Sequence, residues 1–185
     1  MPRKFFLFLL VLPLSLITPE LQAENADVKI MFSPADECGG VILKMISSAQ
    51  KSIELAIYHL TSRSLAKALV MASKNGVSVR VYADGENARE YYSKINFLKK
   101  NGVPVKIESG EGLMHNKFCV IDDSTVITGS YNWTTSADLK NDENLLLIDS
   151  KEIARTYRLQ FEKYWQGDYA DKAFYIDRDK LIKHK

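Results

Sequence analysis

The chain has 185 residues, of which 26% are charged and 46% hydrophobic, and its formal net charge at pH 7 is +2. This length is sufficient for one domain with a substantial hydrophobic core. The small net charge excludes the strongly basic class of duplex-binding proteins, so any affinity for nucleic acid must come from a local basic groove.

The N-terminal residues are typical of an export signal. Two basic residues precede an apolar run over residues 5–17, and the small residue Ala23 follows at a suitable cleavage position. This pattern predicts a secretory signal peptide over residues 1–23 and a mature domain over residues 24–185. The alternative is an uncleaved membrane anchor, although the run is shorter than the ~20 apolar residues that usually span a bilayer. We therefore expect a periplasmic or secreted protein, with membrane association only through this segment.

The rest of the chain alternates between strand and helix patterns. Alternating apolar residues predict strands, and apolar residues three or four positions apart predict amphipathic helices. The expected strands lie at 28–32, 53–58, 77–83, 103–107, around His115, at 126–128 and at 145–148. The expected helices lie at 40–51, after a cap at Thr61 as far as Asn75–Gly76, at 92–100 and at 153–165. This order predicts a one-domain α/β fold with a sheet between helical layers.

Cysteine and histidine positions give no indication of a metal site. Cys38 falls in a loop before a helix and Cys119 on a strand, and a disulfide would need their Cα atoms within about 7 Å. We expect two unpaired, buried thiols. His59, His115 and His184 are scattered, so no metal ligand set and no cofactor are predicted.

The most informative segment reads His-Asn-Lys-Phe-Cys-Val-Ile-Asp over residues 115–122, with Gly-Ser-Tyr-Asn behind it at 129–132. Side chains two residues apart on a strand point the same way, so His115 and Lys117 are expected to share one face. An imidazole beside a fixed positive charge suits attack on a phosphoryl group, whose negative charge must be screened. The segment therefore predicts phosphoryl chemistry.

The spacing His-x-Lys-x4-Asp, followed by Gly-Ser-x-Asn and a later Glu-Asn pair, resembles the signature of the phospholipase D superfamily. The matching positions are His115, Lys117, Asp122, Gly129, Ser130, Asn132 and Glu143. Segments at 32–34, 52–61 and 77–81 are also similar to the short bacterial endonuclease branch, and the resemblance runs from about residue 28 to residue 164. It implies a mixed β-sheet sandwiched between helices, with one motif per chain.

In that superfamily the motif histidine attacks phosphorus and forms a phosphohistidine that water hydrolyses, and the resemblance gives this role to His115. A neutral imidazole must present one free nitrogen, so its other nitrogen needs a partner. Glu143 is the expected partner, which would fix the tautomer. Lys117 is expected to clamp the phosphate.

Three residues behind the motif offer suitable contacts for the nonbridging phosphate oxygens. Ser130 supplies a hydroxyl and Asn132 an amide, while Gly129 permits close backbone approach. Asp122 is different, because at five residues after Lys117 it should face away from the site. We expect Asp122 to support the turn or a salt bridge.

Aromatic and basic residues near the motif leave two alternatives open. Tyr131 and Trp133 flank Asn132 and could stack on bases, but core packing is the expected fate of Trp133. A set of basic side chains could line a groove or simply be solvated; these are Arg80, Arg89, Lys94, Lys99 and Lys100.

Phosphodiester cleavage needs a nucleophile on one side and an acid for the leaving oxygen on the other. Since the motif occurs once, we expect a twofold homodimer in which both His115 side chains face one phosphate. We expect an exported, metal-independent phosphodiesterase or endonuclease, and the resemblance implies that it acts on single-stranded or non-specific DNA or RNA. The alternative is a phospholipase D-type hydrolase of membrane phospholipids.

Overall fold

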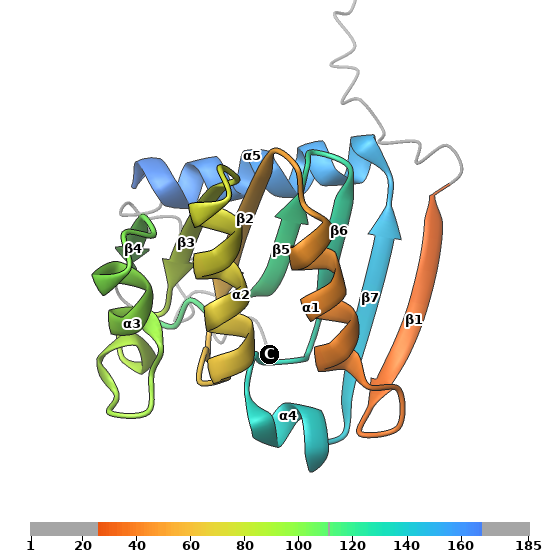
Figure 1. Ribbon diagram of the computed structural model, residues 1–185, viewed down its shortest axis with the longest axis horizontal. Coiled ribbons are helices and arrows are strands. Elements are labelled where there is room, and N and C mark those ends of the chain that lie inside the picture. Colours follow the sequence, from red (N-terminus) through yellow and green to blue (C-terminus); the bar gives the residue numbers. More distant parts are fainter. Residues whose placement is uncertain (1–25, 111, 168–185) are drawn as a thin grey trace, which may run out of the picture.

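The computed structural model describes residues 26–110 and 112–167, which form a seven-stranded sheet with helices on both faces (Figure 1). The strands are β1 (Asp27–Ser33), β2 (Ser52–Ile57), β3 (Ser78–Ala83), β4 (Val105–Ile107), β5 (Lys117–Ile121), β6 (Thr125–Gly129) and β7 (Glu143–Asp149). Their order is β1-β7-β6-β5-β2-β3-β4. Strand β3 runs parallel to β2 and β4, and the other pairs are antiparallel. The mixed α/β sheet is therefore confirmed.

The helices divide between the two faces of this sheet. They are α1 (Cys38–Ser48), α2 (Arg63–Lys74), the 3₁₀ turn η1 (Asn87–Arg89), α3 (Ile95–Lys100), α4 (Thr135–Leu139) and α5 (Lys151–Gln166). Figure 1 shows α1 and α2 in front of the sheet and the long α5 behind it. The expectation of a sheet between helical layers is confirmed.

Each face of the sheet has its own hydrophobic core. On the α1 and α2 side, Ile42 and Leu69 pack with Leu55 of β2 in the larger cluster. On the α5 side, Phe161 packs with Phe118 of β5 in the smaller cluster. All five residues of β5 are buried, because this central strand has a helical layer on both sides.

The largest difference from the sequence prediction concerns the motif strand. Strand β5 begins at Lys117, so His115 lies in the segment before it, and the argument from strand alternation is wrong for His115. Helix α2 is capped by the side chain of Ser62, which accepts a hydrogen bond from the Leu65 amide, and not by Thr61. The short helices η1 and α4 were not predicted, because elements this short carry no apolar period.

Arg80 was one of the residues considered for a basic groove, and the structure gives it another position. Its guanidinium pairs with Glu54, which is only 3% exposed, and with Glu162 of α5. It also lies over the rings of Phe161 and Trp165. Arg80 therefore links β2, β3 and α5, and it contributes to the fold and not to a groove.

The predicted signal peptide (1–23) and the residues of the tail after 167 lie outside the described residues. Within the described part, no helix is both long enough and apolar enough to span a membrane. Cys38 and Cys119 are both buried and free, which confirms the expectation of two unpaired thiols. Trp133 is also buried, as expected for a core residue.

Candidate active site

All the motif residues except Asp122 gather at one end of the sheet, the lower end in Figure 1, which we call the site end. Strand β2 finishes there at Ile57, which is opposite Lys117 at the start of β5. Strand β1 finishes at Ser33, opposite Glu143 at the start of β7. Strand β6 finishes at Gly129. The antiparallel order thus brings segments that are far apart in the sequence to one edge.

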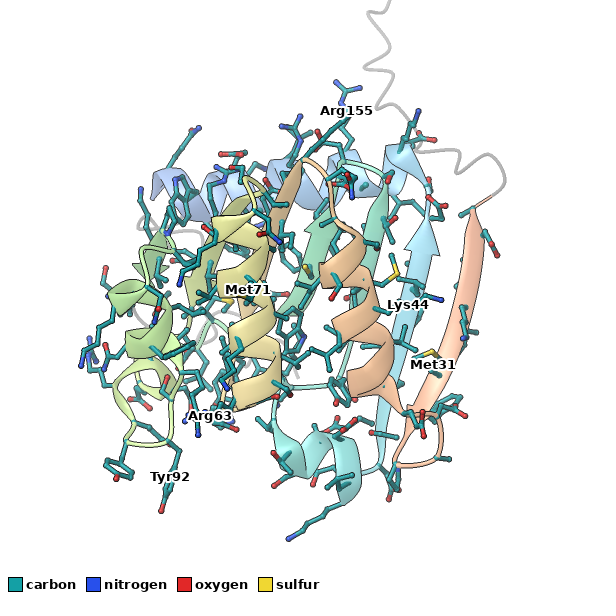
Figure 2. All side chains as sticks on the ribbon, viewed as in Figure 1. Met31, Lys44, Arg63, Met71, Tyr92 and Arg155 are labelled. Carbon is teal, nitrogen blue, oxygen red and sulfur yellow. The ribbon has the colours of Figure 1, made fainter. Side chains whose placement is uncertain are left out.

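Side chains outside the motif also mark this end of the molecule. Figure 2 shows Arg63, the first residue of α2, and Tyr92 at the lower end, whereas Arg155 of α5 lies at the opposite end. Tyr92 is exposed, and so is its neighbour Tyr91. The site end therefore presents both a basic side chain and exposed aromatic rings.

His115 and Lys117 come together through two contacts that do not depend on strand alternation. The Lys117 ammonium donates a hydrogen bond to the His115 carbonyl oxygen at 2.6 Å. Both side chains also contact the ring of Tyr58, which follows β2. The His115 ring lies 4.4 Å from it between centroids, and Lys117 Nζ lies 4.7 Å from its centre. The imidazole and the ammonium thus contact the same aromatic ring.

Lys117 is an unusual lysine because its side chain is almost buried, at 8% exposure. Burial lowers the pKa of Lys117, while the carboxylates of Glu143 and Asp84 favour its charged form and oppose that shift. A partly desolvated ammonium is attracted more strongly to an anion than a solvated one is. This position suits a residue that binds a phosphate.

Glu143 and Ser130 form a hydrogen-bonded pair beside Lys117. The Ser130 hydroxyl donates to Glu143 Oε2 at 2.5 Å and accepts from the Asn144 amide at 3.1 Å. Asn141 donates to the other oxygen of Glu143 at 3.0 Å. The described contacts of Glu143 are thus with Ser130, Asn141 and the charge of Lys117. Its role in orienting His115 stays a prediction.

Gly129 is required by the backbone at the end of β6. Its φ is 143°, and a Cβ atom at this position would lie 2.2 Å from the carbonyl oxygen of Asn144. The close backbone approach expected at this glycine is therefore made by Asn144 of the neighbouring strand. A phosphate contact at Gly129 stays a prediction.

Asn132 is fixed by the segment that follows β2. Its side-chain oxygen, Oδ1, accepts a hydrogen bond from the backbone N–H of His59 at 3.2 Å. The donor nitrogen of the same side chain, Nδ2, takes no part in that bond. The next residue, Trp133, donates its backbone N–H to the His59 carbonyl at 3.0 Å. Because a nonbridging phosphate oxygen needs a donor, this orientation of Asn132 suits the predicted role.

Asp122 lies beyond the other end of β5, in the hairpin turn that leads to β6. It has a positive φ of 53°, and its carboxylate accepts hydrogen bonds from three consecutive backbone amides, those of Gln50, Lys51 and Ser52. Burial raises the pKa of Asp122, but these amides outweigh it, and the net pKa is lowered. The carboxylate joins the hairpin to the start of β2 and is distant from the site end along β5.

Replacing Asp122 by asparagine should destabilise the protein without removing activity. Asparagine tolerates a positive φ, so the change removes mainly the charge. We expect the free energy of unfolding, measured in urea at pH 7, to fall by about 1–2 kcal/mol. This loss is smaller than for fully buried hydrogen bonds, because solvent screens the partly exposed carboxylate. Because the pKa of Asp122 is lower in the folded than in the unfolded protein, its charged form stabilises the fold at pH values above the ordinary carboxyl pKa. The difference in unfolding free energy between the wild-type protein and Asp122→Asn should therefore shrink as pH falls below about 4. Asp123→Asn is the matched control: Asp123 lies in the same turn with a positive φ, and its exposed carboxylate pairs with the exposed Arg158, a surface contact that contributes little to stability. Equal losses in both variants would contradict this role.

The structure adds three residues that the sequence interpretation did not assign to the site: Tyr58, His59 and Asp84. Asp84 is 1% exposed, follows β3 and accepts hydrogen bonds from the amides of Asn87 and Met114. It thereby holds the segment before His115 against the η1 turn. All three follow directly after buried strands, and this position was the available signal in the sequence.

The imidazole of His115 has a lowered pKa. Desolvation is the main cause, and the charge of Lys117 adds to it, whereas Asp84 acts in the opposite direction and His59 lowers the pKa further. A lowered pKa keeps the imidazole neutral, which is the form that can attack phosphorus.

We therefore expect the acidic limb of the activity profile to lie below pH ~6.5, the ordinary histidine value. Lys117→Met removes the positive charge, so an NMR titration of this variant should give a higher pKa for His115 than the wild-type protein. Lys67→Met on α2 serves as a control for the loss of one charge elsewhere. An unchanged or lower His115 pKa in Lys117→Met would contradict the electrostatic cause.

Among residues 26–110 and 112–167, no three histidine, cysteine or acidic side chains gather in a way that could hold a metal ion. The described site brings an imidazole, an ammonium and an amide to one sheet edge, beside the Ser130 hydroxyl, whose hydrogen is donated to Glu143. These groups can attack a phosphodiester and bind its oxygens.

Comparisons with known proteins agree with this geometry. Residues 42–165 match the family described as cardiolipin synthase, PLD-like domain. The chain is 37% identical over 139 residues to a mitochondrial cardiolipin hydrolase of Xenopus tropicalis, and 35% identical over 136 residues to a phospholipase D of Rickettsia prowazekii (strain Madrid E). These matches cover 75% and 74% of this chain, but only 66% of each relative. The chain thus spans slightly less than two thirds of the length of these curated relatives.

Two solved structures are similar over nearly their whole length. One is the phospholipase D family member Nuc from Salmonella typhimurium, with a TM-score of 0.72 and 29% identity over 77% of this chain and 95% of that one. The other is NucT from Helicobacter pylori, with a TM-score of 0.71 and 27% identity over 77% of this chain and 97% of that one. With the motif present once, the chain belongs to the phospholipase D superfamily, in its short single-motif branch.

Proposed function

We propose that this protein is a metal-independent phosphodiesterase that hydrolyses nucleic acid through a phosphohistidine at His115. The observation that carries the proposal is the contact of His115 and Lys117 with one tyrosine ring, at the same sheet end as Ser130 and Asn132. In this mechanism the neutral imidazole attacks phosphorus, and the buried ammonium binds a nonbridging oxygen. The Asn132 amide binds another oxygen of the same phosphate.

Nucleic acid is the substrate class that the site end favours. Tyr91 and Tyr92 are 93% and 70% exposed, and their rings meet edge to face at 5.3 Å. Their segment is joined to the site, because the Lys94 amide donates to the Leu60 carbonyl at 2.9 Å, one residue after His59. Exposed tyrosines stack on unpaired bases at ~1–3 kcal/mol per base, so the substrate we propose is single-stranded DNA or RNA. Similarity to the two short structures supports the same choice.

A phospholipid substrate is the second candidate, and it is favoured by different observations. The names of the curated relatives include cardiolipin hydrolase and phospholipase D. In addition, Leu113 near the nucleophile and Leu139 of α4 are exposed apolar side chains. Such side chains could contact acyl chains, while the phosphodiester chemistry would be the same.

We further propose that the active unit is a homodimer with a composite site, because one motif supplies one histidine. Edge strand β1 offers an apolar surface for association: Val28, Ile30 and Phe32 are 43–60% exposed on one face of the strand. Phe32 is next to Ser33, which pairs with Glu143 at the site end. Contiguous exposed apolar side chains of this kind mark association surfaces.

The proposed location follows from the N-terminal residues. We propose that residues 1–23 direct export and are removed, so that residues 24–185 act in the periplasm or outside the cell. Mass spectrometry of the protein from its native membrane and soluble fractions tests this proposal. An intact N-terminus in the membrane fraction would instead support the anchor over residues 5–17.

The test of the function is a side-by-side assay in excess EDTA with single-stranded DNA, RNA, duplex DNA and phospholipid vesicles. We expect cleavage of the single-stranded substrates at an unchanged rate after chelation, and a raised KM for them in Tyr91→Ala/Tyr92→Ala. Leu159→Ala, an exposed uncharged side chain on α5, is the control variant. Loss of activity in EDTA that divalent cations restore would contradict the mechanism, and cleavage of the vesicles alone would establish the lipid alternative.

A further inference from the structure

Tyr58 occupies a position between the two motif residues that carry the chemistry. It is the first residue after β2, and its amide donates a hydrogen bond to the carbonyl of Asn116 at 2.9 Å. Asn116 is the residue between His115 and Lys117. This bond therefore places the Tyr58 backbone beside the segment on which the nucleophile and the phosphate clamp lie.

The ring of Tyr58 contacts three cationic or titratable side chains. The His115 ring is 4.4 Å away with an interplanar angle of 59°, and the His59 ring is 4.7 Å away with an angle of 31°. Lys117 Nζ lies 4.7 Å from the ring centre, within the range of a cation–π contact. One half-buried ring thus forms a common surface for two imidazoles and an ammonium.

These contacts matter most for His115, whose ring is not held within a strand. His115 is exposed and precedes β5, so the sheet itself does not fix its ring. The Lys117 ammonium is held by the His115 carbonyl and by the aromatic face. A misplacement of about 1 Å at a reacting group can cost ~10²-fold in rate. A rigid ring that contacts both groups would prevent such a misplacement.

We propose that Tyr58 is a positioning residue, whose ring fixes the His115 imidazole and the Lys117 ammonium relative to each other for attack on the phosphodiester. This inference rests on the proposed function of His115 and Lys117 and adds a residue outside the motif. The aromatic face is the acting group, so phenylalanine should replace tyrosine. Leucine should not, because it supplies volume without a π-face.

The test compares Tyr58→Phe, Tyr58→Leu and Tyr58→Ala on bis(p-nitrophenyl) phosphate, a one-phosphate substrate that requires no contacts with bases or acyl chains. We expect Tyr58→Phe to keep kcat within about threefold, because the ring remains. Tyr58→Leu should lower kcat by about tenfold and Tyr58→Ala by ~10²-fold. Tyr157→Ala is the matched control: Tyr157 is half-buried on α5, where its ring contacts Phe118.

A second readout separates positioning from general packing. Desolvation lowers the pKa of His115, and we expect the contacting ring of Tyr58 to contribute to it. An NMR titration should then give a raised His115 pKa in Tyr58→Ala and an unchanged one in Tyr58→Phe. Tyr157→Ala should lower the thermal midpoint without moving that pKa or kcat.

Two results would overturn the inference. One is a Tyr58→Leu enzyme with wild-type kcat. The other is a Tyr58→Ala enzyme that loses stability and activity together with no change in the His115 titration. Failure of the proposed function has a different outcome, because His115→Ala, assayed in parallel, would then remain active. An inactive His115→Ala beside a fully active Tyr58→Leu would reject the positioning role alone.

Discussion

Replacing His115 by alanine is expected to abolish turnover, with a loss greater than ~10⁴-fold. A general acid or base alone contributes ~10²–10⁴-fold, and in the composite site that we propose His115 would serve as nucleophile in one subunit and as acid in the other. The side chain is exposed, so the fold should tolerate its removal. We expect a thermal midpoint close to that of the wild-type protein.

Covalent labelling distinguishes the nucleophile from a residue that only binds substrate. Wild-type protein mixed with radiolabelled substrate and quenched at alkaline pH should retain labelled phosphate, while His115→Ala should retain none. Asp122→Asn serves as the folded, active control, since Asp122 bonds to backbone amides away from the site end. Retention of a tenth of the wild-type activity in His115→Ala would remove His115 from the mechanism.

Mixing wild-type chains with an excess of His115→Ala chains should inhibit activity far beyond simple dilution. In the proposed homodimer each active unit requires two imidazoles, so a heterodimer would lack either the nucleophile or the acid. With nine variant chains for each wild-type chain and free subunit exchange, random pairing leaves about one dimer in a hundred fully wild-type. Activity should then fall about a hundredfold, ten times more than dilution predicts.

A control for this experiment is a His115→Ala chain that carries a second substitution on the exposed face of β1. A chain that combines His115→Ala with Ile30→Glu carries a charge on the apolar surface proposed for association. It should sediment as a monomer, and in the mixture the activity should fall only in proportion to the fraction of wild-type chains. A linear fall with His115→Ala itself, or a fully active wild-type monomer at assay concentration, would show that one chain suffices. Another acid would then be needed, and Glu143 would be examined first.

Regular structure in this chain was predictable because local patterns determine it. Strands such as β3 and the hairpin of β5 and β6 follow from apolar runs and from a polar turn at Asp122 and Asp123. The two thiols were expected to be buried and free, and they are. The motif spacing was sufficient to predict the superfamily and a mixed sheet between helices, since those residues are close together in the sequence.

The arrangement of the site depended on contacts that no local pattern contains. Strand alternation would have placed His115 beside Lys117, but β5 begins only at Lys117. The two residues meet instead through a carbonyl hydrogen bond and through Tyr58, more than fifty positions earlier in the chain. Antiparallel pairing of β2 with β5 brings these segments together, and the register of that pairing is set by the whole core.

The same reason explains the other residues that sequence interpretation assigned differently or not at all. Arg80 was considered for a surface groove, yet helix α5, which begins about seventy residues later, supplies Glu162 and two aromatic rings that contact it. Asp84 is buried beside the segment before His115 because β3 ends at the same sheet edge. The sequence by itself predicted most of the longer elements, the family and the candidate reacting groups. Only tertiary packing decided which side chains orient those groups, because distant segments contact one another only once the sheet is assembled.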